Sequence, residues 1–344
     1  MAAQIDFNFL TPFIEGASKA LRDLCNISAR IDKVAPAAEV EDIPIAIAGV
    51  IGITGAKYRG AMTIGFPTAV FLHIMSKMLG EDYKEITPEL ADGAAELSNI
   101  VFGQAKMTLN QLGHNIQMAL PNVVMGKEVA SRPSNNADAA RIIFETAAGP
   151  FMIEFVGHAV TETKSAASNA ASAPSVLAGE PPKLDGKVLM TFVDGIKKAL
   201  TVQFGAEPKA LAPFQKSAEK RYQFDIGGMI GVNSNSFGGT FAICFAKQAF
   251  IKILESMMGE PVPEITREHE DAATEIVNIT FGEAKRVLNE KGYGLEMAIP
   301  TIIRGVDVES LYPSRKPPIV LPFEVFGSMI WIEFAFGADA KKKK

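Results

Sequence analysis

Cysteine and histidine are scarce in this chain of 344 residues, which contains two cysteines and four histidines. Cys25 and Cys244 have no metal-binding or redox spacing around them, so we expect both to be reduced, buried thiols in a cytoplasmic protein. The histidines also lack the spacing of metal ligands, and surface or packing roles are favoured for them. The sequence therefore predicts no metal site in this chain.

Long apolar runs and basic clusters are scarce as well. The most apolar stretch, from Ile43 to Ile53, contains Pro44 and two glycines and is far too short to span a bilayer. The net charge is −5 and no basic stripe is visible, which argues against nucleic acid as a partner. The N-terminus shows no signal-peptide pattern, and the run Lys341–Lys344 is expected to be a solvated tail. We expect no membrane insertion and a cytoplasmic location.

What the chain does contain is one unit repeated at a constant offset of 179 positions. Hydrophobic residues make up 48% of the sequence, enough for two well-packed domains of ordinary size. We expect domains at residues 1–160 and 183–338, a flexible Ala/Ser/Pro-rich linker at 161–182 that lets them pack together, and a Lys-rich tail at 339–344. The matching pairs include Phe13 with Phe192, Gly49 with Gly228, Gly52 with Gly231, Gly80 with Gly259, Pro121 with Pro300, and Glu154 with Glu333.

Each unit is expected to be α+β (mixed α/β), with an antiparallel-rich sheet packed against a long motif-bearing helix and further helices. The expected elements of the first unit, in the order α-β-β-β-α-α-β-β-β, are Phe9–Leu24, Ile27–Val34, Ile45–Thr54, Tyr58–Phe66, Pro67–Leu79, Thr87–Leu112, Asn115–Leu120, Arg141–Thr146 and Phe151–Val156. Those of the second are Leu189–Leu200, Thr201–Glu207, Tyr222–Val232, Phe237–Phe245, Lys247–Met258, Thr266–Lys291, Gly294–Ile299, Ile319–Val325 and Met329–Phe334.

The long helix of each unit carries the same polar pattern. Identical residues follow one another at intervals of four, three and four, which places them on one side of a helix. We call this side the motif face; it consists of Asp92, Glu96, Asn99, Gly103 and Lys106 in the first copy and Asp271, Glu275, Asn278, Gly282 and Lys285 in the second. The opposite, apolar face is expected to contain Leu90, Ala94, Leu97, Val101, Ala105, Thr108 and Leu112.

The residue types on the motif face indicate a site that acts on a partner. Glycine and asparagine are poor interior helix residues, yet both copies retain them, which disfavours a merely solvated surface. A glycine one turn beyond the asparagine leaves room for a partner to approach. A carboxamide can hold a water molecule, and a carboxylate can pair with a cation on the partner. The reactive groups would then belong mostly to the partner.

These residues resemble the motif of the CheX/CheC/FliY family of chemotaxis response-regulator phosphatases. The resemblance rests on Asp92, Glu96, Asn99 and Pro121, and on their counterparts Asp271, Glu275, Asn278 and Pro300. With one motif each, the units look like CheX domains; the spacing from asparagine to proline is about one residue shorter than the usual family pattern. The fold implied by the resemblance is two CheX-like domains, and similarity to dimeric CheX proteins implies an intrachain pseudo-dimer.

The resemblance also implies a reaction: hydrolysis of the aspartyl phosphate on a CheY-like receiver domain. Glu96 and Glu275 would pair with the receiver's lysine, and Asn99 and Asn278 would orient the attacking water. Asp92, Gly103, Lys106, Asp271, Gly282 and Lys285 would contact the partner. The receiver would supply the phosphoryl group and Mg²⁺, so no cofactor is expected in this chain.

Two alternatives are weighed against this interpretation. A non-enzymatic module could bind phosphorylated receivers or scaffold a flagellar signalling complex, although a pure adaptor would tolerate loss of the asparagine in one copy. A phosphate loop near Gly49, Gly52 and Gly55 is disfavoured because the glycines match no phosphate-binding pattern and lie in strand-like sequence. Bulges or close strand packing explain them better.

Overall fold

A computed structural model describes residues 7–55, 58–118, 121–133, 138–159, 186–217, 219–234, 237–311 and 317–337. The predicted linker and Lys-rich tail lie outside these residues. The first repeat contains α1 (Phe7–Cys25), β1 (Arg30–Pro36), a 3-10 turn (Ala37–Glu39), β2 (Ile45–Thr54), β3 (Tyr58–Phe66), α2 (Thr68–Leu79), α3 (Pro88–Gln111), β4 (Gln117–Met118), β5 (Asn122–Pro133), β6 (Asp138–Thr146) and β7 (Gly149–Ala159).

The second repeat follows nearly the same order. It contains α4 (Gly186–Phe204), β8 (Lys209–Ala210), β9 (Phe214–Gln215), β10 (Phe224–Asn233), β11 (Gly238–Phe245), α5 (Lys247–Met258), α6 (Arg267–Glu290), β12 (Glu296–Met297), β13 (Thr301–Leu311), β14 (Ile319–Val325) and β15 (Ser328–Gly337). None of the helices in the described ranges is both long and apolar enough to cross a membrane.

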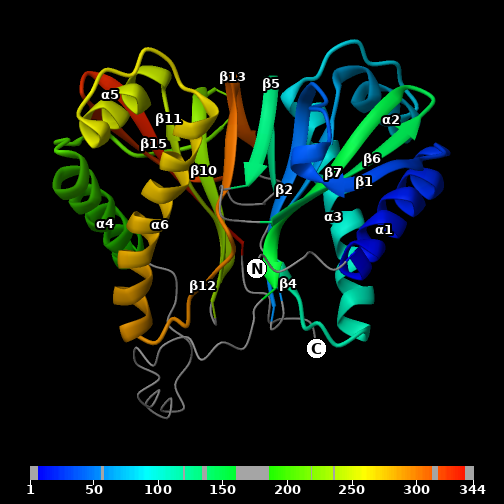
Figure 1. Cartoon of the computed structure of the whole chain (residues 1–344), viewed down its shortest axis with the longest axis horizontal. Coiled ribbons are helices and arrows are strands. Elements are labelled where there is room, and N and C mark those ends of the chain that lie inside the picture. The colour runs from blue at the N-terminus through cyan, green and yellow to red at the C-terminus, as the bar shows by residue number, and fades with distance from the viewer. Residues whose placement is uncertain are drawn as a thin grey trace.

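The strands of both repeats join in one sheet of 15 strands within the described residues. Its main path runs β1-β6-β7-β3-β2-β5-β13-β10-β11-β15-β14-β8, and all the pairings printed along it are antiparallel. The two repeats meet where β5 pairs with β13, at the centre of the molecule (Figure 1). The seam strands therefore hold the repeats together through backbone hydrogen bonds.

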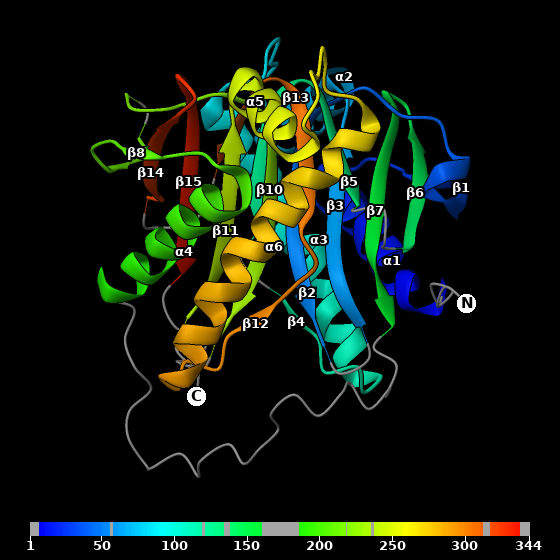
Figure 2. The same cartoon turned by 60° about the vertical axis from the view of Figure 1, so that its left-hand side comes forward.

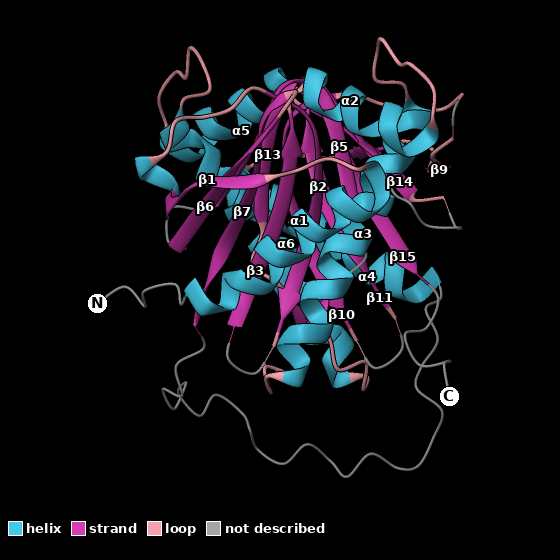
Figure 3. Ribbon diagram, turned by 90° about the vertical axis from the view of Figure 1, so that its right-hand side faces the viewer, coloured by secondary structure: helices cyan, strands magenta, loops and turns pink. Residues whose placement is uncertain are grey.

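Three hydrophobic cores follow from this arrangement. Two lie between a sheet and its helices, one in each repeat, and the helices occupy the outside of the molecule (Figure 3). The third contains residues of both repeats, including Val50 and Met152 from the first and Met229 and Cys244 from the second. The helix-free faces of the two half-sheets thus pack on each other, and this burial of apolar area stabilises the pairing.

The two half-sheets lie in close contact at residues that are equivalent in the two repeats. A Cβ atom added to Gly52 would lie 2.8 Å from the Cα atom of Gly231, so position 52 does not tolerate a side chain without movement. Two residues further on, Asn233 Nδ2 donates a hydrogen bond to Thr54 Oγ1 at 3.2 Å. Both contacts join residues 179 positions apart, which places them at the local two-fold relation between the repeats.

A fully buried glutamate occupies the same position in each repeat but is neutralised differently. Arg141 on β6 binds Glu154 on the neighbouring β7, with Nη2 2.7 Å from Oε2. In the second repeat Val320 takes the place of the arginine beside Glu333. There Lys216, which follows β9, reaches Glu333 Oε1 at 3.2 Å, and Tyr222 donates to Oε2 at 2.7 Å. Each buried charge is paired, as burial requires.

The structure confirms most of the predicted elements, and it differs from the prediction in two respects. The strand expected at Thr201–Glu207 is wrong, because α4 continues to Phe204 and buries both Leu200 and Phe204 in the second core. The long seam strands β5 and β13 were not predicted. The glycines at 49 and 52 lie in a regular stretch of the β2–β3 pairing, without a bulge. Close packing explains them, but the neighbour of Gly52 is the other repeat.

Both cysteines are free and buried, as predicted. Burial raises the pKa of the Cys25 thiol and of the Cys244 thiol, and the nearby Glu333 carboxylate adds to the effect at Cys244. Both groups are therefore protonated and inert at neutral pH.

Candidate functional site

The motif helices α3 and α6 begin at well-capped threonines. Thr87 Oγ1 accepts a hydrogen bond from the Leu90 N–H at 3.3 Å, and Pro88 occupies the first helical position. At the start of α6 the Thr266 N–H donates to His269 Nδ1 at 3.1 Å, so a histidine completes the cap. These contacts fix where each helix begins and hence which residues face outward.

A glycine beneath each motif helix sets its distance from the sheet. A Cβ atom added to Gly49 on β2 would collide with the side chain of Ser98 on α3. One added to Gly228 on β10 would lie 2.6 Å from Val277 Cγ2 and 2.9 Å from the Ala273 carbonyl oxygen on α6. Both helices therefore rest directly on strand backbone, which is why glycine occurs at these positions.

Gly228→Ala is expected to lower stability, since the collision involves the backbone of α6 and cannot be relieved by a side-chain rotation alone. Overpacking of this kind costs about 1–3 kcal/mol. A shift in the midpoint of denaturant unfolding measures it. Gly282→Ala is the matched control on α6 itself, because a Cβ there meets open space. Equal stability of the two variants would contradict this account of the helix seat.

The motif faces point away from the sheet, as predicted. Glu96, Asn99 and Gly103 are exposed on α3, and Glu275, Asn278 and Gly282 are exposed on α6. No hydrogen bond or ion pair within the described residues engages the side chains of Glu96, Asn99, Glu275 or Asn278. The carboxylate and carboxamide of each helix, one turn apart, are thus available to a partner.

The remaining predicted site residues are distributed less evenly. Asp92 is exposed, whereas Asp271, Lys106 and Lys285 are half-buried. On the opposite side of α3 the predicted apolar residues from Leu90 to Ala105 are buried. Leu112 is an exception, because it caps the helix and is 63% exposed. Its assignment to the buried face was wrong.

Lys285 differs from Lys106 through a neighbour in the other repeat. Burial lowers the pKa of Lys285, and the positive charge of Arg59 on β3 lowers it further, while Glu296 on β12 opposes both. Gly238 occupies the position equivalent to Arg59, so the first motif face lacks such a cross-repeat cation. The two motif faces therefore share their glutamate and asparagine but differ in the charged residues around the lysine.

An asparagine near the end of each motif helix holds the following loop, and it was not predicted. Asn110 Nδ2 donates to the Ile116 carbonyl at 3.2 Å, and the Ile116 N–H donates to Asn110 Oδ1 at 2.5 Å. Asn289 makes the same pair of bonds with Leu295, at 3.2 and 2.6 Å. The sequence did contain a signal for this role, because Asn110 and Asn289 are the same residue type at positions 179 apart. These hydrogen bonds hold the residues directly after each motif helix, ahead of the buried prolines Pro121 and Pro300.

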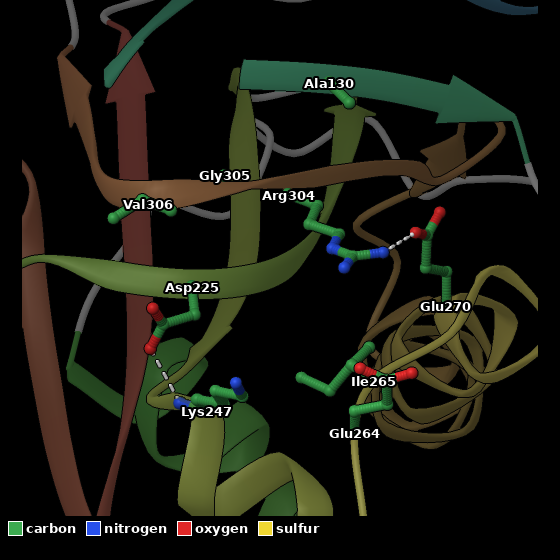
Figure 4. A pocket seen from close by; sticks show the side chains of 9 residues that line it. All are labelled: Ala130, Asp225, Lys247, Glu264, Ile265, Glu270, Arg304, Gly305 and Val306. Carbon is green, nitrogen blue, oxygen red and sulfur yellow. Dashed lines mark hydrogen bonds and ion pairs between the residues drawn. The ribbon is translucent and has the colours of Figure 1, made fainter. Parts of the chain in front are cut away.

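A cleft of roughly 500 Å³ lies at the seam near the start of α6, apart from the motif face (Figure 4). Three of its charged side chains are used by the fold: Arg304 Nη1 lies 2.6 Å from Glu270 Oε1, and Asp225 Oδ2 accepts the Lys247 N–H at the start of α5. The first repeat has Ala91 and Met125 where the second has Glu270 and Arg304. The ion pair of this cleft therefore has no counterpart at the equivalent residues of the first repeat, whereas the motif face is shared by both repeats.

The structure does not bring the two motif faces together. α3 and α6 lie on opposite sides of the packed half-sheets (Figure 1), and Figure 2 shows α6 crossing in front of the sheet while α3 lies behind it. Each helix packs on its own repeat, α3 on β2 and α6 on β10. Each repeat thus has a complete motif face.

Comparison with known sequences gives the same two units. The family described as "Chemotaxis phosphatase CheX" matches residues 47–145 and 226–324, which together make up more than half of the chain. The chain belongs to the CheX family. The second matched segment is offset from the first by 179 positions at both its first and its last residue, and each segment contains one motif helix. Membership confirms the fold class inferred from the sequence, two CheX-like domains of mixed helix and sheet.

Individual relatives of the CheX domains are similar at modest identity. The chain is 27% identical over 126 residues to "CheY-P phosphatase CheX" of Thermotoga maritima, covering 36% of this chain and 80% of the relative. A solved CheC-like superfamily protein from Shewanella is 27% identical, with a TM-score of 0.42, and covers 45% of this chain and 100% of its own. CheX from Vibrio vulnificus is 26% identical, with a TM-score of 0.42, covering 44% and 99%.

Proposed function

We propose that this CheX-family chain is a phosphatase that hydrolyses the aspartyl phosphate of a CheY-like receiver domain. The observation that carries the proposal is the duplicated, exposed pair of Glu96 with Asn99 and Glu275 with Asn278, whose side chains have no partner among the described residues. The related protein of Thermotoga maritima carries the name CheY-P phosphatase, which supports this substrate class.

The chemistry of the pair suits a site that acts on another protein. The carboxamide of Asn99 or Asn278 can accept and donate hydrogen bonds at once, so it can hold a water molecule in line with the phosphorus atom. The carboxylate of Glu96 or Glu275 would pair with the receiver's lysine. The receiver would contribute the phosphoryl group and Mg²⁺, which stabilise the charge of the transition state.

The direct test is the lifetime of a phosphorylated receiver. We expect a small amount of the chain to shorten the lifetime of the aspartyl phosphate on an excess of receiver in the presence of Mg²⁺. Phosphate release, followed continuously, gives kcat and KM. If the chain binds the phosphorylated receiver without shortening its lifetime, the scaffold function replaces the phosphatase function.

We further propose that the two repeats form an intrachain pseudo-dimer in solution. Pairing of β5 with β13 and the shared third core support this proposal. Since the motif faces lie on opposite sides, both can be occupied by receivers together. Independent tumbling of the two repeats in relaxation or scattering measurements would contradict it.

Gly103 and Gly282 provide a test of close approach. A Cβ atom at either position meets nothing within 4 Å, so alanine fits the free protein and should stabilise each helix by about 0.5–1 kcal/mol. A receiver seated against the glycine would be displaced, and we expect the double variant to lose roughly tenfold in kcat/KM. Higher stability with unchanged kcat/KM would show that the receiver does not approach this part of the helix.

A further inference from the structure

The two motif faces differ in a stripe of three residues along the far half of each helix. We call it the distal stripe; on α3 it consists of Gln104, Met107 and Gln111, and on α6 of Glu283, Arg286 and Glu290. Residues three, four and seven apart share one side of a helix, so the stripe runs beside the glutamate and glycine of the motif face. All three equivalent positions change from uncharged to charged between the repeats.

On α3 the distal stripe presents an apolar side chain to solvent. Met107 is 60% exposed and stands four residues beyond Gly103. A single exposed methionine is unremarkable by itself, but its place one turn beyond the open glycine puts it where a docked receiver would extend. Methionine is flexible and polarisable, which suits it to a protein contact.

On α6 the same positions form a network of charges. Arg286 Nη1 lies 2.7 Å from Glu290 Oε1, and Arg286 Nη2 lies 3.1 Å from Glu283 Oε1. Lys198 on α4 reaches Glu283 Oε1 at 3.4 Å. Hydrogen bonds from Arg286 lower the pKa of Glu283, so the network is ionised at neutral pH. No large hydrophobic side chain on the described α6 is exposed in the way Met107 is.

We propose that the two repeats select receivers of different surface chemistry through the distal stripe. This inference rests on the proposed phosphatase function. We expect the receiver that docks on α3 to place an apolar side chain opposite Met107. We expect the receiver that docks on α6 to carry charged side chains that complement Glu283, Arg286 and Glu290. The glutamate and asparagine are shared by both sites, so the stripe changes docking, measured as KM, and leaves the chemical step alone.

Salt separates the two modes of docking, because exposed charge pairs are screened and apolar contacts are not. Asn278→Ala leaves only the first site working, and Asn99→Ala leaves only the second. With one CheY-like receiver phosphorylated by acetyl phosphate in Mg²⁺, we expect KM to rise about two- to fivefold for the second site between about 0.05 M and 0.5 M salt. At the first site salt screens only the pair between Glu96 and the receiver's lysine, which both sites share, so KM should rise less there than at the second site, and kcat should change little at either site.

Exchange of the stripes provides the decisive variants. In the Asn278→Ala background, Gln104→Glu, Met107→Arg and Gln111→Glu should raise the salt dependence of KM at the first site to that of the second. In the Asn99→Ala background, Glu283→Gln, Arg286→Met and Glu290→Gln should lower the salt dependence of KM at the second site to that of the first. Four of the six positions are exposed, and Gln104 and Glu283 are half-buried, so circular dichroism should match that of the parent proteins and thermal unfolding reports any loss from the pair between Lys198 and Glu283.

Three outcomes separate this inference from the proposed function. Equal salt dependence of KM at both sites, unchanged by the exchange, overturns the inference while leaving the phosphatase intact. If only one site accepts the receiver used, the silent site must become active when it carries the other stripe, and failure to do so also overturns the inference. If the wild-type chain accelerates no dephosphorylation, the proposed function itself fails.

Discussion

Replacing Asn99 and Asn278 together by alanine should remove the acceleration of receiver dephosphorylation, by about 10²-fold or more in kcat. Loss of the carboxamide leaves the attacking water without the group that orients it. Each single variant should retain the activity of the other site. The double variant should remain folded, because both asparagines are exposed and alanine is the better helix former. Phosphate release and thermal unfolding, measured on the same preparations, check both halves of the prediction.

The glutamates give the matched control for this experiment. Glu96→Ala with Glu275→Ala removes the pairing with the receiver's lysine and should act mainly on KM, whereas the asparagine variants act mainly on kcat. Asn99→Gln with Asn278→Gln keeps the amide but moves it by one methylene group, and it should also fail. A double asparagine variant as fast as wild type would refute the assignment of these residues.

Arg141→Met is expected to cause the largest loss of stability, about 3–5 kcal/mol. Glu154 is 0% exposed, and the variant removes the guanidinium that binds its carboxylate through Nε at 2.9 Å and Nη2 at 2.7 Å. The midpoint of denaturant unfolding measures the loss. The penalty should shrink as the pH is lowered, because a protonated carboxyl costs less to bury than a carboxylate.

A second variant separates loss of packing from loss of charge. Arg141→Met combined with Glu154→Leu removes both charges and should recover most of the lost stability, since an apolar pair of similar volume replaces the buried ion pair. The cost would then lie in the unpaired charge. If the double variant is as unstable as Arg141→Met alone, the arginine stabilises the fold through contacts other than Glu154. The bonds from Arg141 Nη1 to Asp42 and to the carbonyls of Val40 and Glu41 are the candidates.

The strands with clear turn signals could be predicted from the sequence, and the seam could not. β2, β3 and β14 have the predicted bounds, since each is a compact apolar run delimited by turn residues or glycine. β5 carries Val123 in the core of the first repeat and Val124 in the core between the repeats. The first residues of β5, 122–124, are buried on both faces and show no alternation, so the period gives no signal there. Its partner, β13, is also nearly 180 residues away along the chain.

The sequence was sufficient to predict that the side chains of the motif face are exposed and lie on one side of the helix, because helical spacing decides both properties. The sequence could not predict the contacts between the two repeats. Arg59 acts on Lys285 from the other repeat, and no local pattern records that proximity. Likewise, Lys216 replaces the arginine partner of the buried glutamate from a different element. The roles of Glu96, Asn99, Glu275 and Asn278 stay predictions until the variants are assayed.

The hydrogen bond from Asn233 to Thr54 joins equivalent positions of the two repeats, yet the two residues differ in type. In a dimer of identical chains, equivalent residues that meet across a two-fold axis must be the same type. Any substitution there appears in both chains, and the new residue faces a second copy of itself. Joining the units in one chain lifts that restriction, and an amide donor can face a hydroxyl acceptor. Covalent fusion thereby lets each half of the molecule specialise while the other half remains unchanged.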